Sequence, residues 1–135
     1  MTEFRTRKVE KHHYRDYLSR AEQCLASAEA AWTQGHWDAC AINAIQSAVS
    51  ASDAVTAFGL GLRSAGQSHA DAVGLFRQTE AQDQSTQDAA SRLSRILGAK
   101  NTSAYEEKPV KPREAEFLLA EARKLLDFAK SKLPV

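Results

Sequence analysis

Hydrophobic residues recur at intervals of three and four residues along most of the chain, which is the periodicity of amphipathic helices. The first such segment covers residues 10–34, and its apolar positions are Tyr14, Leu18, Ala21, Leu25, Ala28 and Trp32. Gly35 follows this segment and is a typical C-terminal stop. The pattern then predicts a second long helix over residues 36–58. Because the connection at Gly35 is short, these two helices are predicted to form an antiparallel hairpin.

The second long helix carries many small side chains on the face that the pattern turns inward. They are Ala44, Ser47, Ala48, Ala51 and Ser52. Small side chains let a neighbouring helix approach closely. We therefore expect this helix to lie at the centre of the bundle.

Three shorter patterns predict further helices in the second half of the chain. One covers about residues 70–77, one covers about residues 85–97 and ends at Gly98, and a last one begins at Pro112. The inner face predicted for the last helix is Phe117, Leu118, Ala122, Leu125, Leu126 and Ala129. No segment shows the alternating pattern of a strand bounded by turns. The sequence thus predicts an all-α fold, an antiparallel up-and-down bundle of four or five helices.

Length and composition favour one ordinary globular domain. The chain has 135 residues, 43% of them hydrophobic and 26% charged, which is enough to bury a single core. We expect residues 1–135 to form one domain, with a core over about 10–132 and a frayed N-terminus at 1–9. The two cysteines show no metal or disulfide spacing, no apolar run is long enough to cross a membrane, and the first residues lack a signal-peptide core. These features predict a cytoplasmic protein without membrane contact.

Charge is unevenly distributed, although the formal net charge is only +1. Between Arg20 and Arg63 there is no lysine or arginine, whereas the first twenty residues and the segment from Arg92 to Arg113 are rich in both. Such segregation is typical either of a solvated surface or of a face that binds phosphates. Both interpretations stay open at this point.

The stretch from Leu60 to Asp71 combines glycines, an arginine, a histidine and a helix-start signal. Ser68, followed three residues later by Asp71, predicts an N-cap with an acidic first turn and places His69 at the first helical position. A helix N-terminus offers unpaired amides to an anion, and Arg63 adds a planar guanidinium suited to phosphate. The stretch is a candidate phosphate or RNA-backbone site, with His69 as general base. Alternatively, the glycines only allow a turn and the histidine satisfies a neighbouring group.

The sequence gives no sign of a metal or cofactor site. It contains no phosphate loop, no dinucleotide-binding glycine pattern and no H-E-x-x-H helix. His12 and His13 are adjacent, so on a helix they point roughly 100° apart and do not clamp one ion. We therefore predict neither a metal nor a cofactor.

Several short stretches together resemble the HEPN domain, a small helical module of prokaryotic toxin–antitoxin and defence systems. The resemblance covers about residues 14–130 and is nearest to an uncharacterised bacterial branch. The stretches are Tyr17-Leu18-x-x-Ala21, the run from Ala44 to Ala54, Gly61-x-Arg63-Ser64-Ala65-Gly66-x-x-His69-x-x-Ala72, and Lys100-Asn101-x-x-x-Tyr105-Glu106.

The resemblance implies a helical bundle that pairs as a homodimer. Many members are metal-independent RNases whose signature is an arginine, four to six residues and a histidine, a spacing that Arg63 and His69 satisfy. In many members this element lies near the start of the last long helix. There this chain has Lys100, Asn101 and Tyr105, with no histidine.

This departure from the family pattern favours binding over catalysis. The preferred interpretation is a module that binds a nucleotide or RNA phosphate through Arg63, His69, Ser68, Lys100, Asn101 and Tyr105, in a toxin–antitoxin or defence system. A nucleotidyltransferase-like antitoxin is then a candidate partner. One alternative is an RNase in which His69 deprotonates a ribose 2′-hydroxyl and Arg63 stabilises the charged phosphate. The other alternative is a structural dimerisation bundle.

Overall fold

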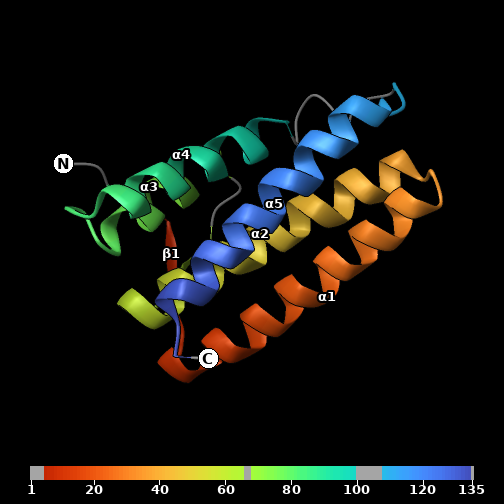
Figure 1. The fold of residues 1–135 in the computed structure, drawn as a ribbon. Helices are drawn as coiled ribbons and strands as arrows, with labels where there is room; N and C mark the ends of the chain where they lie inside the picture. Colours follow the sequence, from red (N-terminus) through yellow and green to blue (C-terminus); the bar gives the residue numbers. More distant parts are fainter. Residues whose placement is uncertain (1–4, 66–67, 100–107, 135) are drawn as a thin grey trace.

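The computed structural model describes residues 5–65, 68–99 and 108–134, and this part of the chain forms five α-helices with one small sheet (Figure 1). In chain order the elements are β1 (Thr6–Lys8), a 3-10 turn (Lys11–His13), α1 (Tyr14–Thr33), α2 (Trp37–Leu60), β2 (Leu62–Ser64), α3 (His69–Gln78), α4 (Gln84–Ala99) and α5 (Pro112–Lys132). The arrangement confirms the helical bundle that the periodicity predicts.

Helices α1 and α2 form the predicted antiparallel hairpin, and Gly35 turns the chain between them with a φ of 74°. The rings of Trp32 and Trp37 pack against each other across this turn, with centroids 4.9 Å apart. Helix α5 runs in the same direction as α2 (Figure 1). Accordingly, the Cys40 thiol near the start of α2 lies 4.0 Å from the carbonyl oxygen of Ala115 near the start of α5.

Helix α2 is the axis of the bundle, as its small residues predict. It packs against α1, α3, α4 and α5, and Ala44, Ala48 and Ala51 are fully buried. The Ser47 hydroxyl, also fully buried, donates a 2.8 Å hydrogen bond to the carbonyl oxygen of Ala21 on α1. A bond of this kind satisfies a polar group inside a closely packed helix pair.

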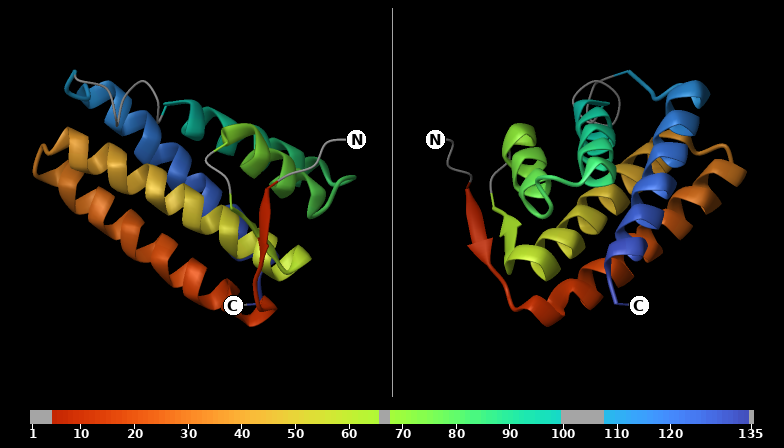
Figure 2. Two further views of the ribbon diagram at one scale, coloured as in Figure 1. Left: turned by 180° about the vertical axis from the view of Figure 1, so that it is seen from behind. Right: turned by 60° about the vertical axis from the view of Figure 1, so that its left-hand side comes forward.

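The two-stranded sheet is the main departure from the expected fold. Strands β1 and β2 lie side by side and pair antiparallel (Figure 2). Their register places Arg7 opposite Arg63. Gly61 ends α2 with a φ of 65°, and its carbonyl oxygen accepts a 3.0 Å hydrogen bond from the amide of Val9. The expectation of a frayed segment at residues 1–9 is therefore wrong for residues 6–8. Backbone pairing holds them, and their exposed polar side chains give no apolar alternation that would predict a strand.

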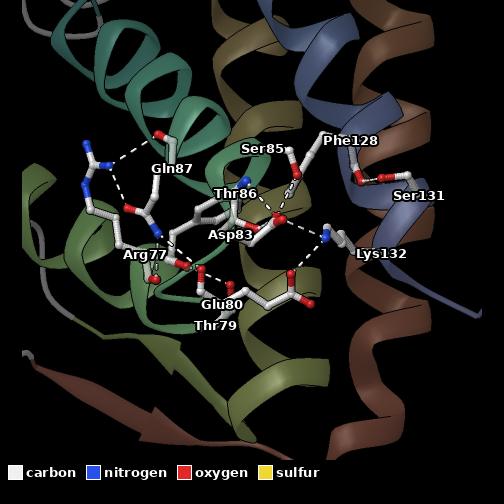
Figure 3. Close-up of polar contacts among 11 residues, drawn as sticks. Arg77, Thr79, Glu80, Asp83, Ser85, Thr86, Gln87, Phe128, Ser131 and Lys132 are labelled. Atoms are coloured by element: carbon white, nitrogen blue, oxygen red, sulfur yellow. Dashed lines mark hydrogen bonds and ion pairs between the residues drawn. The ribbon is translucent and has the colours of Figure 1, made fainter.

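A polar cluster joins the turn between α3 and α4 to the end of α5 (Figure 3). The Asp83 carboxylate accepts hydrogen bonds from the Thr86 amide at 3.0 Å, the Ser85 hydroxyl at 2.6 Å and the Lys132 ammonium at 3.1 Å. Lys132 also donates to Glu80 at 2.8 Å. Hydrogen bonds from Ser85, Thr86 and Lys132 hold the pKa of Asp83 well below its ordinary value. The cluster thus caps α4 and fixes it against α5.

Phe117 does not lie on the inner face of α5, contrary to the prediction. Its exposed fraction is 44%, while the neighbouring Leu118 is buried. Successive residues of an α-helix point about 100° apart. Phe117 precedes the buried Leu118, so it lies on the flank of α5 and not on its buried face. Hydrophobic periodicity alone assigns such an apolar flank residue to the inner face, although its side chain is exposed to solvent. Within the described residues, no helix combines the length and the apolar character needed to cross a bilayer.

Replacing Phe76 by alanine tests the core that these helices share. Phe76 is fully buried on α3 and its ring lies 5.9 Å from that of Phe128 on α5. We expect Phe76→Ala to lower the free energy of unfolding by about 3–5 kcal/mol, the usual cost of such a cavity. Urea denaturation measures the free energy of unfolding. Phe117→Ala is the matched control, and we expect it to lower that free energy by about 1 kcal/mol or less. Equal losses in the two variants would contradict this assignment of the core.

Candidate functional site

A surface hollow lies where the sheet meets the start of α1, and positive side chains line it. Its volume is about 960 Å³. Arg7 and Lys8 come from β1, Arg20 from α1 and Arg63 from β2. The remaining lining residues are Val9, Glu10, His13, Tyr17, Leu60, Gly61 and Leu62. We call this surface the basic hollow.

The strand register places two guanidinium groups on opposite strands of the same small sheet. Arg7 and Arg63 are direct cross-strand partners, and like charges at such positions repel each other. The fold therefore accepts a local electrostatic cost at the hollow. An anion bound between the two guanidinium groups would offset that cost.

Beneath Arg63 lies a buried carboxylate on the central helix. The Asp53 Oδ2 atom is 3.8 Å from the Nη1 atom of Arg63, and the Asp53 side chain is only 12% exposed. Burial raises the pKa of Asp53 to about 6, while the positive charges of Arg63 and Arg20 act in the opposite direction. Asp53 thus draws Arg63 toward α2 and faces a second arginine of the hollow.

The hollow keeps an excess of positive charge after this pairing. Four cationic side chains, Arg7, Lys8, Arg20 and Arg63, line the hollow, and the acidic groups near them are Glu10, Asp53 and Asp16. His13 at the rim is 2.9 Å from Asp16 through its Nδ1 atom. An arrangement of this kind attracts anions, and arginine forks bind phosphate oxygens in pairs.

The helix start predicted at Ser68 is confirmed. Ser68 is the N-cap of α3, its hydroxyl accepts a 3.3 Å hydrogen bond from the amide of Asp71, and His69 is the first helical residue. His69 is partly buried against α4, where its Nε2 atom lies 3.0 Å from the Ser94 hydroxyl. A Cβ atom at Gly98 on the same helix would meet the His69 ring at 3.6 Å.

Arg63 and His69 therefore contact different helices. Arg63 lines the basic hollow and pairs with α2, whereas His69 packs on α4 and is not among the residues that line the hollow. The other predicted site residues, Lys100, Asn101 and Tyr105, lie outside the described residues. Of the three predicted site residues that the structure describes, Arg63, Ser68 and His69, only Arg63 lines the hollow.

Sequence reasoning missed three of the four cations that line the hollow. Arg7, Lys8 and Arg20 belong to the basic N-terminal segment, so the charge bias was the available signal. A further signal was Asp53, an acidic residue within a long apolar helical segment without any lysine or arginine. Locating the hollow also required the pairing of β1 with β2, which the side-chain pattern does not predict.

Metal chemistry finds no support in the part of the chain that the structure describes. Within residues 5–65, 68–99 and 108–134, no three histidine, cysteine, aspartate or glutamate side chains lie close enough to hold an ion together. What the lining residues of the hollow supply is fixed positive charge, from Arg7, Lys8, Arg20 and Arg63.

Comparison with known proteins gives one clear result. A family model described as the HEPN domain matches residues 14–132, which includes α1 to α5 and all lining residues of the hollow beyond position 13. No curated protein and no solved structure is significantly similar to the chain.

Asp53→Asn tests the buried carboxylate beneath the hollow. A carboxyl group whose pKa is about 6 in the folded protein and 3.8 in the unfolded chain binds more protons when folded, so it makes the protein less stable as the pH rises from about 4 to about 6. We expect Asp53→Asn to remove this dependence. Relative to the unmodified protein, the variant should gain on the order of 2 kcal/mol between pH 4 and pH 7. Urea unfolding at several pH values measures the gain.

The matched control for this experiment is His13→Gln. Histidines also titrate between pH 5 and 8, and His13 lines the same hollow. The control variant should retain the loss of stability that Asp53 causes between pH 4 and pH 6. Parallel stability curves for Asp53→Asn and the unmodified protein would show that Asp53 is not the titrating group.

Proposed function

The chain belongs to the HEPN family, and we propose that it binds a phosphate-bearing ligand, a nucleotide or an RNA, in the basic hollow. The observation that carries the proposal is the convergence of Arg7, Lys8, Arg20 and Arg63 on one hollow of about 960 Å³. This volume is in the range of pockets that hold small ligands.

The chemistry of the hollow matches a phosphate better than a carboxylate or a neutral ligand. Two arginines on opposite strands, Arg7 and Arg63, offer several N–H donors to tetrahedral oxygens. Tyr17 adds an aromatic ring, with the Arg20 guanidinium 5.9 Å from its centroid. A ring beside cations suits a ligand in which a base or sugar accompanies the phosphate.

Asp53 positions the Arg63 side chain in the hollow before a ligand binds. In the free protein its carboxylate partly neutralises Arg63, so the guanidinium is held in place before a ligand arrives. The 3.8 Å between Arg63 Nη1 and Asp53 Oδ2 is too long for a hydrogen bond. Arg63 can therefore bind a ligand without breaking a hydrogen bond to Asp53. A doubly charged phosphate also carries more negative charge than the single carboxylate of Asp53.

The proposal also includes the oligomeric state of the chain, the cellular system in which it acts and its protein partner. HEPN membership supports a homodimer, a cytoplasmic role in a toxin–antitoxin or defence system, and a nucleotidyltransferase-like partner. Size-exclusion chromatography with light scattering tests whether the chain forms a homodimer. Affinity purification of the tagged chain from cells that co-express a nucleotidyltransferase tests the proposed partner.

Replacing the hollow arginines tests the proposed function. We expect Arg20→Gln and Arg63→Gln each to weaken nucleotide and RNA binding by about tenfold, because a hydrogen bond to a charged group contributes about 1.5–3 kcal/mol. Arg123→Gln is the matched control, since Arg123 lies on α5 and pairs one-to-one with Glu29 at 2.7 Å. Titration calorimetry with ATP and anisotropy of a labelled RNA give the affinities. If both hollow variants bind as tightly as the control, the hollow is not the site.

RNA cleavage by Arg63 and His69 stays a separate prediction. Incubating the same RNA with the protein in the presence of EDTA and separating the products on a gel tests it. Cleavage that is lost in both Arg63→Ala and His69→Ala would support the general-base mechanism. Intact RNA after incubation with the binding-competent protein would leave a binding module, which is the function that the basic hollow supports.

A further inference from the structure

A second group of positive side chains lies between α4 and α5, away from the basic hollow. Three cations converge there on one carboxylate, that of Glu121. The Glu121 Oε1 atom is 3.4 Å from Arg92 Nε and 3.2 Å from Arg95 Nη2, and its Oε2 atom is 3.6 Å from Lys124 Nζ. Arg92 and Arg95 are on α4, one turn apart, and Lys124 is one turn beyond Glu121 on α5.

The charge balance of this cluster differs from that of the neighbouring ion pairs. Arg123 pairs with Glu29 and Lys130 with Glu22, so each of these cations has its own carboxylate. Glu121 is only 7% exposed and serves three cations. Two positive charges are therefore left in excess.

The cations of the cluster keep donors for a ligand. All three distances to Glu121 exceed the 2.7–2.9 Å of a strong charged hydrogen bond. The side chains of Arg95 and Lys124 are 52% and 59% exposed, so their remaining N–H groups face solvent. The buried Nε atom of Arg92 makes no hydrogen bond. Glu121 thus accepts one hydrogen bond, from Arg95 at 3.2 Å, and the exposed side chains of Arg95 and Lys124 offer their remaining N–H groups to a ligand.

An exposed aromatic ring adjoins this cluster on α5. Phe117 is 44% exposed and is one of the two large apolar side chains that the described part of the chain leaves well exposed. At 100° per residue, Arg113, Phe117 and Lys124 lie within roughly 40° of one another around the helix axis. Glu121 follows at the edge of this stripe that faces α4. Along this stripe the Phe117 ring lies between the positive charges of Arg113 and Lys124, and the exposed acids Glu116 and Asp127 flank the stripe on the side away from Glu121.

We propose that Arg92, Arg95, Arg113, Phe117 and Lys124 form a binding strip for single-stranded nucleic acid. Base stacking on an exposed ring combined with cations along the backbone is the chemistry by which proteins hold unpaired strands. A small anion at such exposed cations would be screened by salt. A strand compensates by making several contacts at once. The strip goes beyond the proposed function, since it does not need the basic hollow.

Phe117→Ala is the most direct test of the strip. Anisotropy of a labelled twelve-nucleotide single strand measures the affinity, with the same sequence as a duplex for comparison. We expect Phe117→Ala to weaken single-strand binding by about five- to a hundredfold, the usual effect of losing one stacked base. Phe117→Trp should retain the affinity. Both variants should melt within about 5 °C of the unmodified protein.

The cations of the strip are tested against matched cations of α5. We expect Lys124→Gln and Arg95→Gln to weaken single-strand binding several-fold and to reduce its salt dependence. Lys130→Gln and Arg123→Gln remove the same charge from one-to-one ion pairs and should change the affinity less than twofold. Equal effects in the two sets would overturn the proposal, because they would show only a response to net charge.

The outcomes also separate this proposal from that of the hollow. If Phe117→Ala weakens single-strand binding and Arg63→Gln does not, the strip stands, and the affinity of Arg63→Gln for ATP then decides whether the hollow is a nucleotide site. If Arg63→Gln alone weakens single-strand binding, the strip is overturned. The strip would also be overturned if Phe117→Ala changed the oligomeric state and left the affinity for the single strand unchanged. That result would assign Phe117 to a protein interface.

Discussion

The close packing of α2 is the constraint on which the rest of this structure depends. Its alanine and serine positions let the other helices approach its axis, so the buried faces of α2 leave little room for a long polar side chain. Asp53 is the exception, a charged group inside this packed helix. A buried carboxylate is costly unless cations lie close. The arginines that approach it, Arg63 and Arg20, are the same ones that line the basic hollow.

The two candidate binding surfaces share one physical device. In each, a carboxylate with little solvent exposure collects more than one cation: Asp53 at the basic hollow and Glu121 at the strip. Long cationic side chains are otherwise flexible and lose entropy when a ligand orders them. A buried acid beneath them restricts that freedom before binding. Because the cations outnumber the acids, the surface stays positive and the restricted side chains remain available to an anion.

The sequence was sufficient to predict what depends on side-chain periodicity. The helix hairpin at Gly35, the central place of α2 and the cap at Ser68 all follow from local patterns, and the structure has each of them. The β1–β2 pairing could not be predicted, because backbone hydrogen bonds hold it and its side chains are exposed. The basic hollow depends on this pairing, so only Arg63 of its cations was found. Phe117 was misplaced because a flank position resembles the inner face when periodicity alone is considered.

Binding a phosphate and cleaving RNA require different arrangements of side chains. The described side chains fit the requirement for binding better than the requirement for cleavage. Binding a phosphate requires fixed positive charge, which the basic hollow supplies through residues on three elements. Cleavage further requires a base within hydrogen-bond reach of the reacting hydroxyl. The His69 ring is engaged with Ser94 on α4, while Arg63 is directed to Asp53 on α2. His69 is not among the lining residues of the hollow, so it does not supply a base there. A binding role requires no such base, since Arg63 already lines the hollow.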